Sequence, residues 1–413
     1  MATREVDRGS GLIRSGNRFA GSPGLLARLI APGFHKVLDR IDAGLLRGTL
    51  TGHLPDGTKR RLGGRAPGFE VAVTINDWRA LIRLATSGSV GWYQAWEAGE
   101  WESDDPVSLF ALFMDNAATL GGAARAKGPF RLAKQFMHWR NRNSRTGSER
   151  NIHAHYDLGN DFYAAWLDPT MSYSSAIWDQ DDDLEAAQRR KWAALSERLG
   201  NPDSVLEIGC GWGGLAGHLA SQGAKVTAIS LSDEQLAWAR DHESVDIAFR
   251  KQDYRDTRGA FDAVVSVEMV EAVGREYWPS FFDSLARNLK PGGRAAIQYI
   301  SMREELFDDY AASADFIQAY IFPGGLLIRN SEFESLARER GLSWQDRRDF
   351  GIDYARTLEA WRHRFDAALA QGRLPAGFDD RFANLWRYYL MYCEGGFRGG
   401  GIDVHQVTLV KDS

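Results

Sequence analysis

Two glutamates interrupt the apolar run SVEMVEAVG, which spans residues 266–274. Burying a carboxylate without a partner is costly, so acids at the end of such a run require an explanation. Glu268 and Glu271 could serve the structure, by capping the next helix or by pairing with an arginine. They could also serve chemistry, by hydrogen-bonding a cofactor or by accepting a proton. The run by itself does not decide between these roles.

A glycine-rich loop, LEIGCGWGG (206–214), offers a place for a ligand near these acids. Gly209, Gly211 and Gly213 form a GxGxG pattern between an expected strand and an expected helix. Glycine is needed where a backbone turns sharply and approaches a ligand closely. Ligands of parallel sheets lie beyond the carboxyl ends of the strands. Taken alone, the pattern also fits a turn without a ligand.

Three features favour S-adenosylmethionine over a dinucleotide as the ligand of this loop. Glu207 lies near the strand end, where an acid can meet a cationic ligand. The spacing is GxGxG rather than GxGxxG. A last strand is expected over 402–411, after the alternating region, as is typical of methyltransferases.

Two further segments could bind the rest of this cofactor. Ser230 ends the second expected strand, where most such folds place an acid that binds the ribose. The alternative for this segment is a helix N-cap, with Ser232 in that role. Asp253 and Tyr254 follow the third expected strand and could meet the adenine, or they could form a plain polar loop.

The elements that must position these residues follow from the hydrophobic pattern. Short apolar runs alternate with amphipathic helices from about residue 200. This alternation predicts an α/β fold with a parallel, Rossmann-like sheet covered by helices on both faces. A helical stretch over about 303–340 interrupts the alternation and is expected to be a lid-like insertion. The expected strands are 204–211, 224–230, 245–253, 261–269, 292–301 and 402–411.

A smaller α+β domain is expected at the N-terminal side. The segment 49–64 predicts a hairpin with its turn at Pro55-Asp56-Gly57, and 69–75 predicts a strand. Helical spacing is present before the hairpin and again over about 106–139. The polar stretch RNRNSRTGSERN (140–151) marks the expected domain boundary.

Composition limits the cellular context. The net charge of −5 excludes a generally basic nucleic-acid binder. Two cysteines, Cys210 and Cys393, imply no disulfide framework and favour a reducing compartment. No signal peptide and no membrane-spanning run are expected. Residues 125–150 carry eight Lys/Arg and one acid, which predicts either a solvated helix and linker or a patch for anionic phospholipid headgroups.

These motifs, together with HYDLGNDFYAAWLDPTMSYSSAIW (155–178), resemble the cyclopropane-fatty-acyl-phospholipid synthase family, which includes mycolic acid cyclopropane synthases. FIQAYIFPGG (316–325), FGIDYARTLEAW (350–361) and RYYLMYCEGGFRGGGIDVHQVTLVK (387–411) also match, and the resemblance covers roughly 90–413. It implies a class I methyltransferase fold. It also implies a lipid- or membrane-docking domain over 21–142 and a catalytic domain over 143–413, whereas the Gly/Ser/Arg-rich composition of residues 1–20 predicts disorder there.

The resemblance assigns roles to individual residues. The positions that match the family's site for a bicarbonate ion beside the donor methyl group are Ser175, Glu271, Gln298, Ile300 and Tyr354. The positions implied to bind S-adenosylmethionine are Tyr173, Ser174, Glu207, Gly209, Gly211, Gly213, Ser230, Gln235, Asp253 and Tyr254. Glu271 would hold the bicarbonate, or act as the base itself if the ion is absent. No metal site is implied.

The chain departs from the family's pattern at three positions. Ser175 replaces a cysteine, Gln298 replaces a histidine, and Ala272 replaces the histidine of the family's usual FEHVG. Glutamine can donate a hydrogen bond to an anion but cannot titrate, so Gln298 can help to hold bicarbonate but cannot exchange a proton with it.

The function implied by the resemblance is methyl transfer to the double bond of an unsaturated phospholipid acyl chain. A carbocation intermediate would lose a proton to give a cyclopropane, which is the expected product. The alternative is a hydride shift before the proton loss, which gives a methylene branch and, after a later reduction, a methyl branch. The alternatives are a methyltransferase for a small amine or hydroxyl acceptor and a non-catalytic lipid-binding protein. A cytoplasmic enzyme at the inner face of the membrane is expected, with a homodimer as one of the oligomeric states left open.

Overall fold

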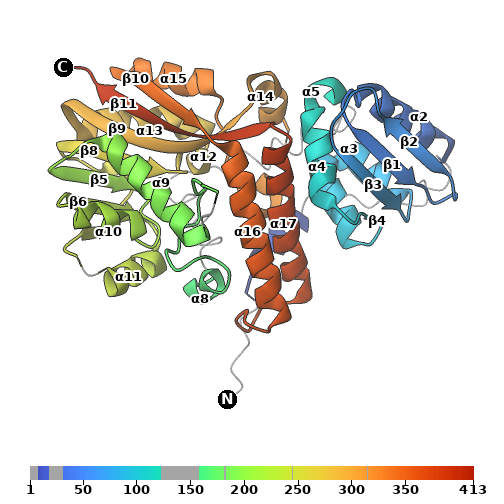
Figure 1. The fold of residues 1–413 in the computed structure, drawn as a ribbon, viewed down its shortest axis with the longest axis horizontal. Coiled ribbons are helices and arrows are strands. Elements are labelled where there is room, and N and C mark those ends of the chain that lie inside the picture. The colour runs from blue at the N-terminus through green and yellow to red at the C-terminus, as the bar shows by residue number, and fades with distance from the viewer. Residues whose placement is uncertain (1–7, 18–30, 122–157, 181–182, 244, 314) are drawn as a thin grey trace. The chain divides into compact units, whose positions relative to one another are not determined.

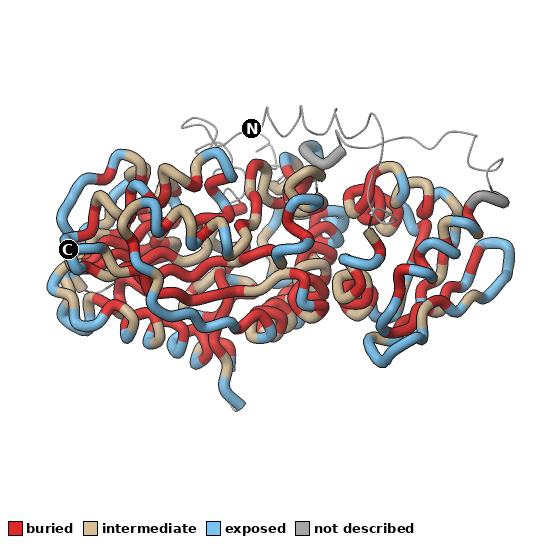
Figure 2. The backbone as a smooth tube through the Cα atoms, turned by 90° about the horizontal axis from the view of Figure 1, so that it is seen from above, coloured by how far each residue is buried: buried red, intermediate tan, exposed pale blue. Residues whose placement is uncertain are grey.

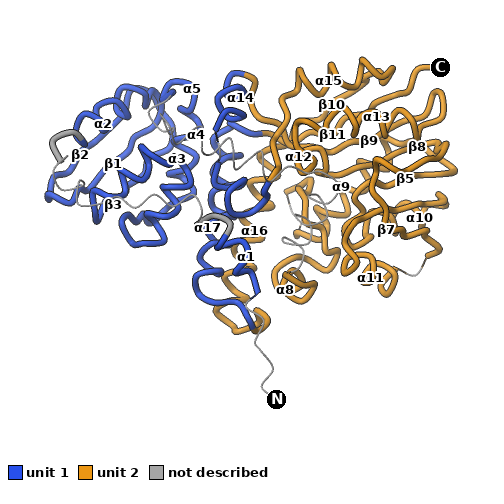
Figure 3. Tube along the Cα trace, turned by 180° about the vertical axis from the view of Figure 1, so that it is seen from behind, with its two compact units in different colours: residues 1–141, 305–323, 377–402 blue, residues 142–304, 324–376, 403–413 orange. Residues whose placement is uncertain are grey.

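The computed structural model describes residues 8–17, 31–121, 158–180, 183–243, 245–313 and 315–413. The basic stretch 125–150 and the expected boundary at 140–151 lie outside these ranges. So do residues 155–157, which begin one of the matching segments. The described chain forms two compact units, which Figure 3 shows in different colours. The first comprises 1–141, 305–323 and 377–402, and the second comprises 142–304, 324–376 and 403–413.

The second unit contains a seven-stranded sheet with the order β10-β11-β9-β8-β5-β6-β7. Five neighbouring strands, β5 to β9, run parallel to one another, and β10 pairs antiparallel with β11. The last strand expected from the sequence is therefore present. The strands are β5 (Ser204–Ile208), β6 (Lys225–Ser230), β7 (Ala248–Lys251), β8 (Phe261–Val267), β9 (Leu289–Met302), β10 (Leu342–Asp349) and β11 (Ile402–Lys411).

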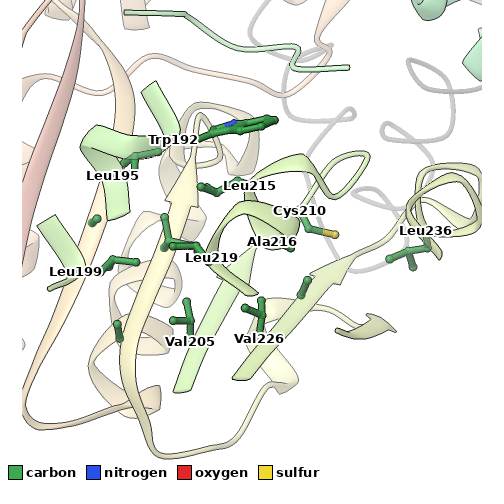
Figure 4. Packing of buried hydrophobic residues seen from close by; sticks show 14 residues of the cluster. Trp192, Leu195, Leu199, Val205, Cys210, Leu215, Ala216, Leu219, Val226 and Leu236 are labelled. Atoms are coloured by element: carbon green, nitrogen blue, oxygen red, sulfur yellow. The ribbon is translucent and has the colours of Figure 1, made fainter. Parts of the chain in front are cut away.

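Helices cover both faces of this sheet, as the alternating pattern predicted (Figure 1). One face packs against α9 (Leu184–Leu199), α10 (Gly214–Ser221) and α11 (Asp233–His242) through the apolar cluster drawn in Figure 4. On the opposite face the Tyr299 ring stacks on Phe333 of α15 (Asn330–Arg338), which contacts Phe282 of α13 (Trp278–Asn288). Successive residues of a strand point to opposite faces, so an apolar strand interior is buried on both sides. The central strands β5 and β8 are mostly buried, whereas the edge strands β7 and β10 are mostly exposed, and Figure 2 shows the buried interior and the exposed margins of the molecule.

Four short elements and one long helix complete the second unit. The long helix α16 (Gly351–Ala370) carries one of the expected site residues. The short elements are α8 (Asn160–Ala164), η3 (Tyr254–Asp256), α12 (Val270–Val273) and η4 (Arg275–Tyr277).

The first unit is built on a four-stranded sheet with the order β2-β1-β3-β4. The expected hairpin is present, with β1 (Thr49–His53) antiparallel to β2 (Lys59–Gly63), and β3 (Glu70–Ile75) is the expected strand. β3 pairs antiparallel with the short β4 (Trp101–Glu102). The helices that the structure describes in this unit are α1 (Ser10–Asn17), α2 (Ala31–Gly44), α3 (Arg79–Glu97), α4 (Pro106–Asp115), α5 (Ala117–Leu120), α14 (Glu304–Ala311), the π-helix η5 (Ile317–Ile321) and α17 (Asp380–Arg398).

Several local expectations differ from the structure. The first strand ends at Ile208, three residues earlier than predicted, and β10 was not among the expected strands. Residues 10–17, for which disorder was predicted, form α1, and Leu12 and Ile13 are buried. The fourth strand ends at Val267, two residues earlier than predicted. The stretch 303–340 is not one continuous helical insertion, because α14 and η5 belong mainly to the first unit while α15 belongs to the second. Among the described residues, no helix is long and apolar enough to cross a bilayer.

Candidate active site

The run SVEMVEAVG (266–274), which contains both glutamates, begins in β8 and continues past the carboxyl end of this strand. Glu268 has a φ of 52°, a backbone conformation that residues other than glycine rarely adopt. This conformation ends the strand, and α12 begins at Val270. Glu271 therefore lies in a short helix rather than at the strand end, where the sequence placed it. A strained residue maintained by its surroundings is typical of functional sites.

The Glu268 carboxylate is held by three hydrogen bonds. Its Oε1 accepts from the backbone N–H of Ser175 at 2.9 Å and from Gln298 Nε2 at 2.9 Å. Its Oε2 accepts from the Tyr354 hydroxyl at 2.8 Å. These three donors are residues that the resemblance assigned to bicarbonate. The structure thus brings them together around a carboxylate of the chain itself.

The two remaining members of the expected set form the second half of the site. The backbone N–H of Ile300 donates to Oε1 of Glu271, which is 8% exposed. Oε2 of Glu271 is buried without a hydrogen-bond partner among the described residues. The Ser175 hydroxyl, which replaces the expected thiol, donates to the carbonyl of Ala176 and not to either glutamate.

The two glutamates have different environments, so their carboxyl groups have different pKa values. Burial raises the pKa of Glu271 to about 8, and the nearby Glu268 carboxylate adds to the rise. Burial also raises the pKa of Glu268, but hydrogen bonds from Gln298, Ser175 and Tyr354 oppose that rise. Glu268 is thus the carboxyl group that ionises first, and Glu271 stays largely protonated at neutral pH. Two carboxyls kept in different states are a common arrangement in acid–base sites.

The glycine loop adopts conformations that its sequence requires. Gly209, Gly211 and Gly213 have φ values of 85°, 52° and 92°, in the region that favours glycine. A Cβ at Gly209 would lie 2.5 Å from the Met269 side chain, whereas a Cβ at Gly211 would meet nothing within 4 Å. The backbone beside Gly211 is therefore open, as a bound ligand requires.

Tyr173 and Ser174 lie in a buried segment before α9. The Ser174 hydroxyl accepts a hydrogen bond from Lys191 Nζ at 2.7 Å, and its carbonyl accepts from Gln188 Nε2 at 3.0 Å. Lys191 is 1% exposed, and burial lowers its pKa to about 8. The charges of Glu268, Asp168 and Glu207, in that order, oppose this fall. Lys191 is thus a buried cation beside the expected cofactor segment.

Glu207 provides a test of whether a cationic cofactor fits this loop. The residue is 3% exposed, and its Oε2 has no hydrogen-bond partner within the described chain. Burial raises its pKa to about 8, with a further rise from Glu243. A buried acid with an unpaired oxygen is suited to a ligand that carries positive charge and hydrogen-bond donors. The residues of this loop therefore fit S-adenosylmethionine.

The expected ribose and adenine residues also lie at the carboxyl ends of their strands. Ser230 donates its hydroxyl to Gln235 Oε1 at 3.2 Å, so these two are adjacent. Ser232 is the N-cap of α11, which confirms the helix-capping role predicted for it from the sequence. The Asp253 carboxylate accepts from Arg255 at 2.5 Å and 2.9 Å. Tyr254 is buried, and its hydroxyl lacks a hydrogen-bond partner among the described residues.

Aromatic rings line the region between Tyr173 and Tyr354. The ring centroid of Trp361 is 5.3 Å from that of Tyr173 and 6.1 Å from that of Tyr354. Trp166 packs against both Trp361 and Tyr173. Aromatic faces attract positive charge, so this cluster could stabilise a cation near the two glutamates.

Sequence reasoning missed Lys191 and left the role of Glu268 open. A signal for Lys191 was present, because the residue shares the apolar face of its helix with Leu184, Ala187 and Leu195. A charged residue on such a face is buried and needs partners. No comparable signal distinguished Glu268 from Glu271, because their difference depends on partners from three distant segments.

One group of three described residues, Asp349, Asp403 and His405, places potential metal-ligand atoms within 4.8 Å of one another. His405 Nδ1 is 2.7 Å from Asp349 Oδ1, and Nε2 is 2.7 Å from Ser301 Oγ. Both ring nitrogens are therefore engaged by hydrogen bonds, and this group does not form a ready metal site.

The buried acids predict how stability depends on pH. The pKa values of Glu207 and Glu271 are raised from 4.5 to about 8, so the folded protein binds protons that the unfolded chain releases. Stability from these groups is complete below the lower value and is lost as pH rises through the upper one. We expect the free energy of unfolding of the cofactor-free protein to fall between about pH 5 and pH 8, measured by chemical denaturation.

The variant Glu271→Gln should remove its share of this slope, which is at most about 1.4 kcal/mol per pH unit. A stability that is flat or rises across the same window would contradict the assignment of these groups as buried and neutral.

Comparison with known proteins agrees with this geometry. The order of the seven strands, the GxGxG loop and the buried Glu207 define an S-adenosylmethionine-dependent methyltransferase. The family model "Mycolic acid cyclopropane synthetase" matches residues 143–407, and the chain belongs to this family. Its members among the similar proteins modify lipid chains, as their names state.

Two curated relatives and one solved structure illustrate the similarity. Tuberculostearic acid methyltransferase UfaA1 of Mycobacterium tuberculosis is 36% identical over 402 residues, covering 89% of this chain and 90% of the relative. Cyclopropane-fatty-acyl-phospholipid synthase of Escherichia coli K12 is 35% identical over 334 residues, covering 80% and 85%. The structure of mycolic acid cyclopropane synthase CmaA1 with SAH and CTAB has a TM-score of 0.59 and 27% identity, covering 64% of this chain and 98% of CmaA1.

Proposed function

We propose that this enzyme methylates the double bond of an unsaturated fatty acyl chain in a membrane phospholipid, with Glu268 as the proton acceptor. The observation that carries the proposal is the buried Glu268 carboxylate, which accepts hydrogen bonds from Ser175, Gln298 and Tyr354. In this proposal Glu268 occupies the place that the resemblance gave to bicarbonate. No second anion is then needed beside the reacting carbons.

An alkene has no proton to remove before it reacts, so the site must position it in a dry, apolar surrounding. S-adenosylmethionine supplies an electrophilic methyl group when bound. The π electrons of the alkene form the bond to that methyl carbon while its bond to sulfur breaks, so the sulfur keeps the electron pair and leaves as S-adenosylhomocysteine. A carbocation remains on the neighbouring alkene carbon. The rings of Tyr173, Tyr354 and Trp361 are placed to stabilise this cation. The Glu268 carboxylate then takes a proton from the added methyl group.

The timing of proton removal decides the product. Removal before any rearrangement closes a cyclopropane. A 1,2-hydride shift before removal moves the charge to the methyl-bearing carbon, and the C–H electrons then form an exocyclic methylene. The three hydrogen bonds make Glu268 a weaker base than an equally buried carboxylate without them, so proton removal is slower and a hydride shift can precede it. We therefore favour the methylene-branched chain.

The names of the relatives support both products. UfaA1 matches over most of this chain and is named a methyltransferase, whereas the Escherichia coli relative is named a cyclopropane synthase. Cyclopropane formation, the product expected from the sequence, is thus the second candidate. Neither product requires a reductant, because each forms when the carbocation loses one proton.

A lipid assay tests the proposal. Protein, S-adenosylmethionine with a ¹³C-methyl group and vesicles of an unsaturated phospholipid are incubated, and the fatty acids are analysed by mass spectrometry and NMR. We expect a gain of one labelled carbon with an alkene ¹³C signal from an exocyclic methylene. A high-field cyclopropane signal would instead support the second candidate. Transfer to an unesterified fatty acid but not to vesicles would overturn the phospholipid assignment, and no transfer to either would overturn the proposed reaction.

A further inference from the structure

A chain of hydrogen bonds leads from Glu268 away from the site and across the sheet. Gln298 Nε2 donates to Glu268, and Gln298 Oε1 accepts from Gln406 Nε2 at 3.0 Å. Gln406 Oε1 accepts from Arg198 Nε at 3.4 Å. Arg198 is in turn held by Asp346, at 2.6 Å from Nη1. Gln298 and Gln406 are both 0% exposed.

Each of the two side-chain amides in this series of hydrogen bonds has one orientation in which all its neighbours are satisfied. A guanidinium has only donors, so Gln406 must turn its oxygen toward Arg198 and its nitrogen toward Gln298. Gln298 must then turn its oxygen toward Gln406 and its nitrogen toward the site. That nitrogen meets two acceptors, the Glu268 carboxylate and the carbonyl of Ser175 at 3.2 Å. The orientation imposed from Arg198 therefore agrees with the one that Glu268 requires.

We infer that Gln406, oriented by Arg198, is a positioning residue that fixes the Gln298 amide so that its nitrogen faces the proton acceptor Glu268. This inference rests on the proposed function, because it assigns Glu268 the role of base. What Gln406 controls is which end of the Gln298 amide, the nitrogen or the oxygen, faces Glu268. An amide can present either a donor or an acceptor to a carboxylate, and only the donor favours the ionised form.

The substitution Gln406→Glu tests this direction without changing the size of the side chain. The introduced carboxylate can satisfy Arg198 but offers Gln298 only an acceptor. Gln298 must then turn its nitrogen away from the site and present its oxygen to Glu268. Losing one donor and gaining a repulsive oxygen raises the pKa of Glu268, so more base is protonated at a given pH. We expect the acid limb of the kcat–pH profile to move up by at least about one pH unit.

Two further variants separate orientation from packing. Gln406→Met fills a similar volume and removes the donor to Gln298 but opposes neither orientation, so its acid limb should move up by clearly less than that of Gln406→Glu. Gln371→Glu is the matched control, because Gln371 is exposed and its Oε1 also accepts from an arginine, Arg373, at 2.8 Å. This control should leave both the profile and cofactor affinity unchanged. Equal effects of Gln406→Glu and Gln406→Met on the acid limb would overturn the inference.

A second readout does not depend on activity. The stability difference between Gln406→Glu and Gln406→Glu/Glu268→Gln, measured against pH, reports the folded-state pKa of Glu268 in the variant. The same comparison between the unmodified protein and Glu268→Gln gives the reference value. A higher pKa in the Gln406→Glu background supports the inference even if no lipid substrate is methylated, whereas equal values contradict it. Failure of the proposed function would appear separately, as an unmodified enzyme without methyl transfer.

Discussion

Replacing Glu268 by glutamine should lower kcat by roughly 10³-fold while leaving the affinity for S-adenosylmethionine within about threefold. The amide keeps the size of the side chain but cannot accept the proton of the added methyl group. It also places an NH₂ group among the donors from Ser175, Gln298 and Tyr354, which now oppose it. Single-turnover kinetics with unsaturated vesicles and calorimetry of cofactor binding measure the two effects.

The matched control is Glu334→Gln. Glu334 is 53% exposed by side chain and pairs only with Arg338 along its own helix at 3.8 Å, among the described contacts. Losing such a surface pair costs little, so activity should remain within about twofold. A Glu268→Gln enzyme with unchanged kcat would show that the proton acceptor is another group.

The variant Glu268→Gly extends this test to the bicarbonate expected from the sequence. Glycine relieves the positive φ of 52° and removes the carboxylate, while the three donors remain in place. A small anion could then occupy the vacated position. We expect the variant to be nearly inactive alone and to regain activity when bicarbonate or formate is added. The unmodified enzyme should not respond to either anion. Stimulation of the unmodified enzyme would instead favour a site that uses both Glu268 and the ion.

Replacing Lys191 by methionine should destabilise the protein by about 3 kcal/mol near neutral pH. The Lys191 ammonium is buried and interacts with Glu268, Asp168 and Glu207, and methionine leaves these acids without a counter-charge. The acids then ionise less readily, so the loss should be smaller at about pH 5, where more of these acids are protonated in the folded protein and need no counter-charge. Chemical denaturation at the two pH values measures the difference. Lower kcat at neutral pH should accompany it, because less Glu268 is ionised.

Lys251→Met is the control for this prediction. Lys251 is 39% exposed by side chain and pairs with Asp233 at 2.6 Å. A surface ion pair contributes about 1 kcal/mol or less, and its loss should not alter the pH dependence of kcat. If Lys191→Met and Lys251→Met had the same effect on stability, the buried charge of Lys191 would not be compensating the acids around it.

The fold of the catalytic unit was predictable because its signals are local. Strand and helix spacing, the glycine turn at Gly209 and the final strand over 402–411 can each be recognised in a short window. The less predictable part is the assignment of 305–323 and 377–402 to the first unit. That assignment depends on contacts between segments hundreds of residues apart, such as Gln94 with Tyr320, and no local pattern encodes them.

The sequence by itself determined the chemistry available: a cofactor loop, two acids at the end of an apolar run and a glutamine in place of a histidine. Only the tertiary structure decided which acid is held as a carboxylate. Glu268 and Glu271 are three residues apart and chemically identical, but they meet different partners. Donors from β9, α16 and the segment before α9 converge on Glu268, whereas the donors to Glu271 within the described chain are backbone N–H groups. A pKa depends on such neighbours in space, and their positions follow from how distant elements pack.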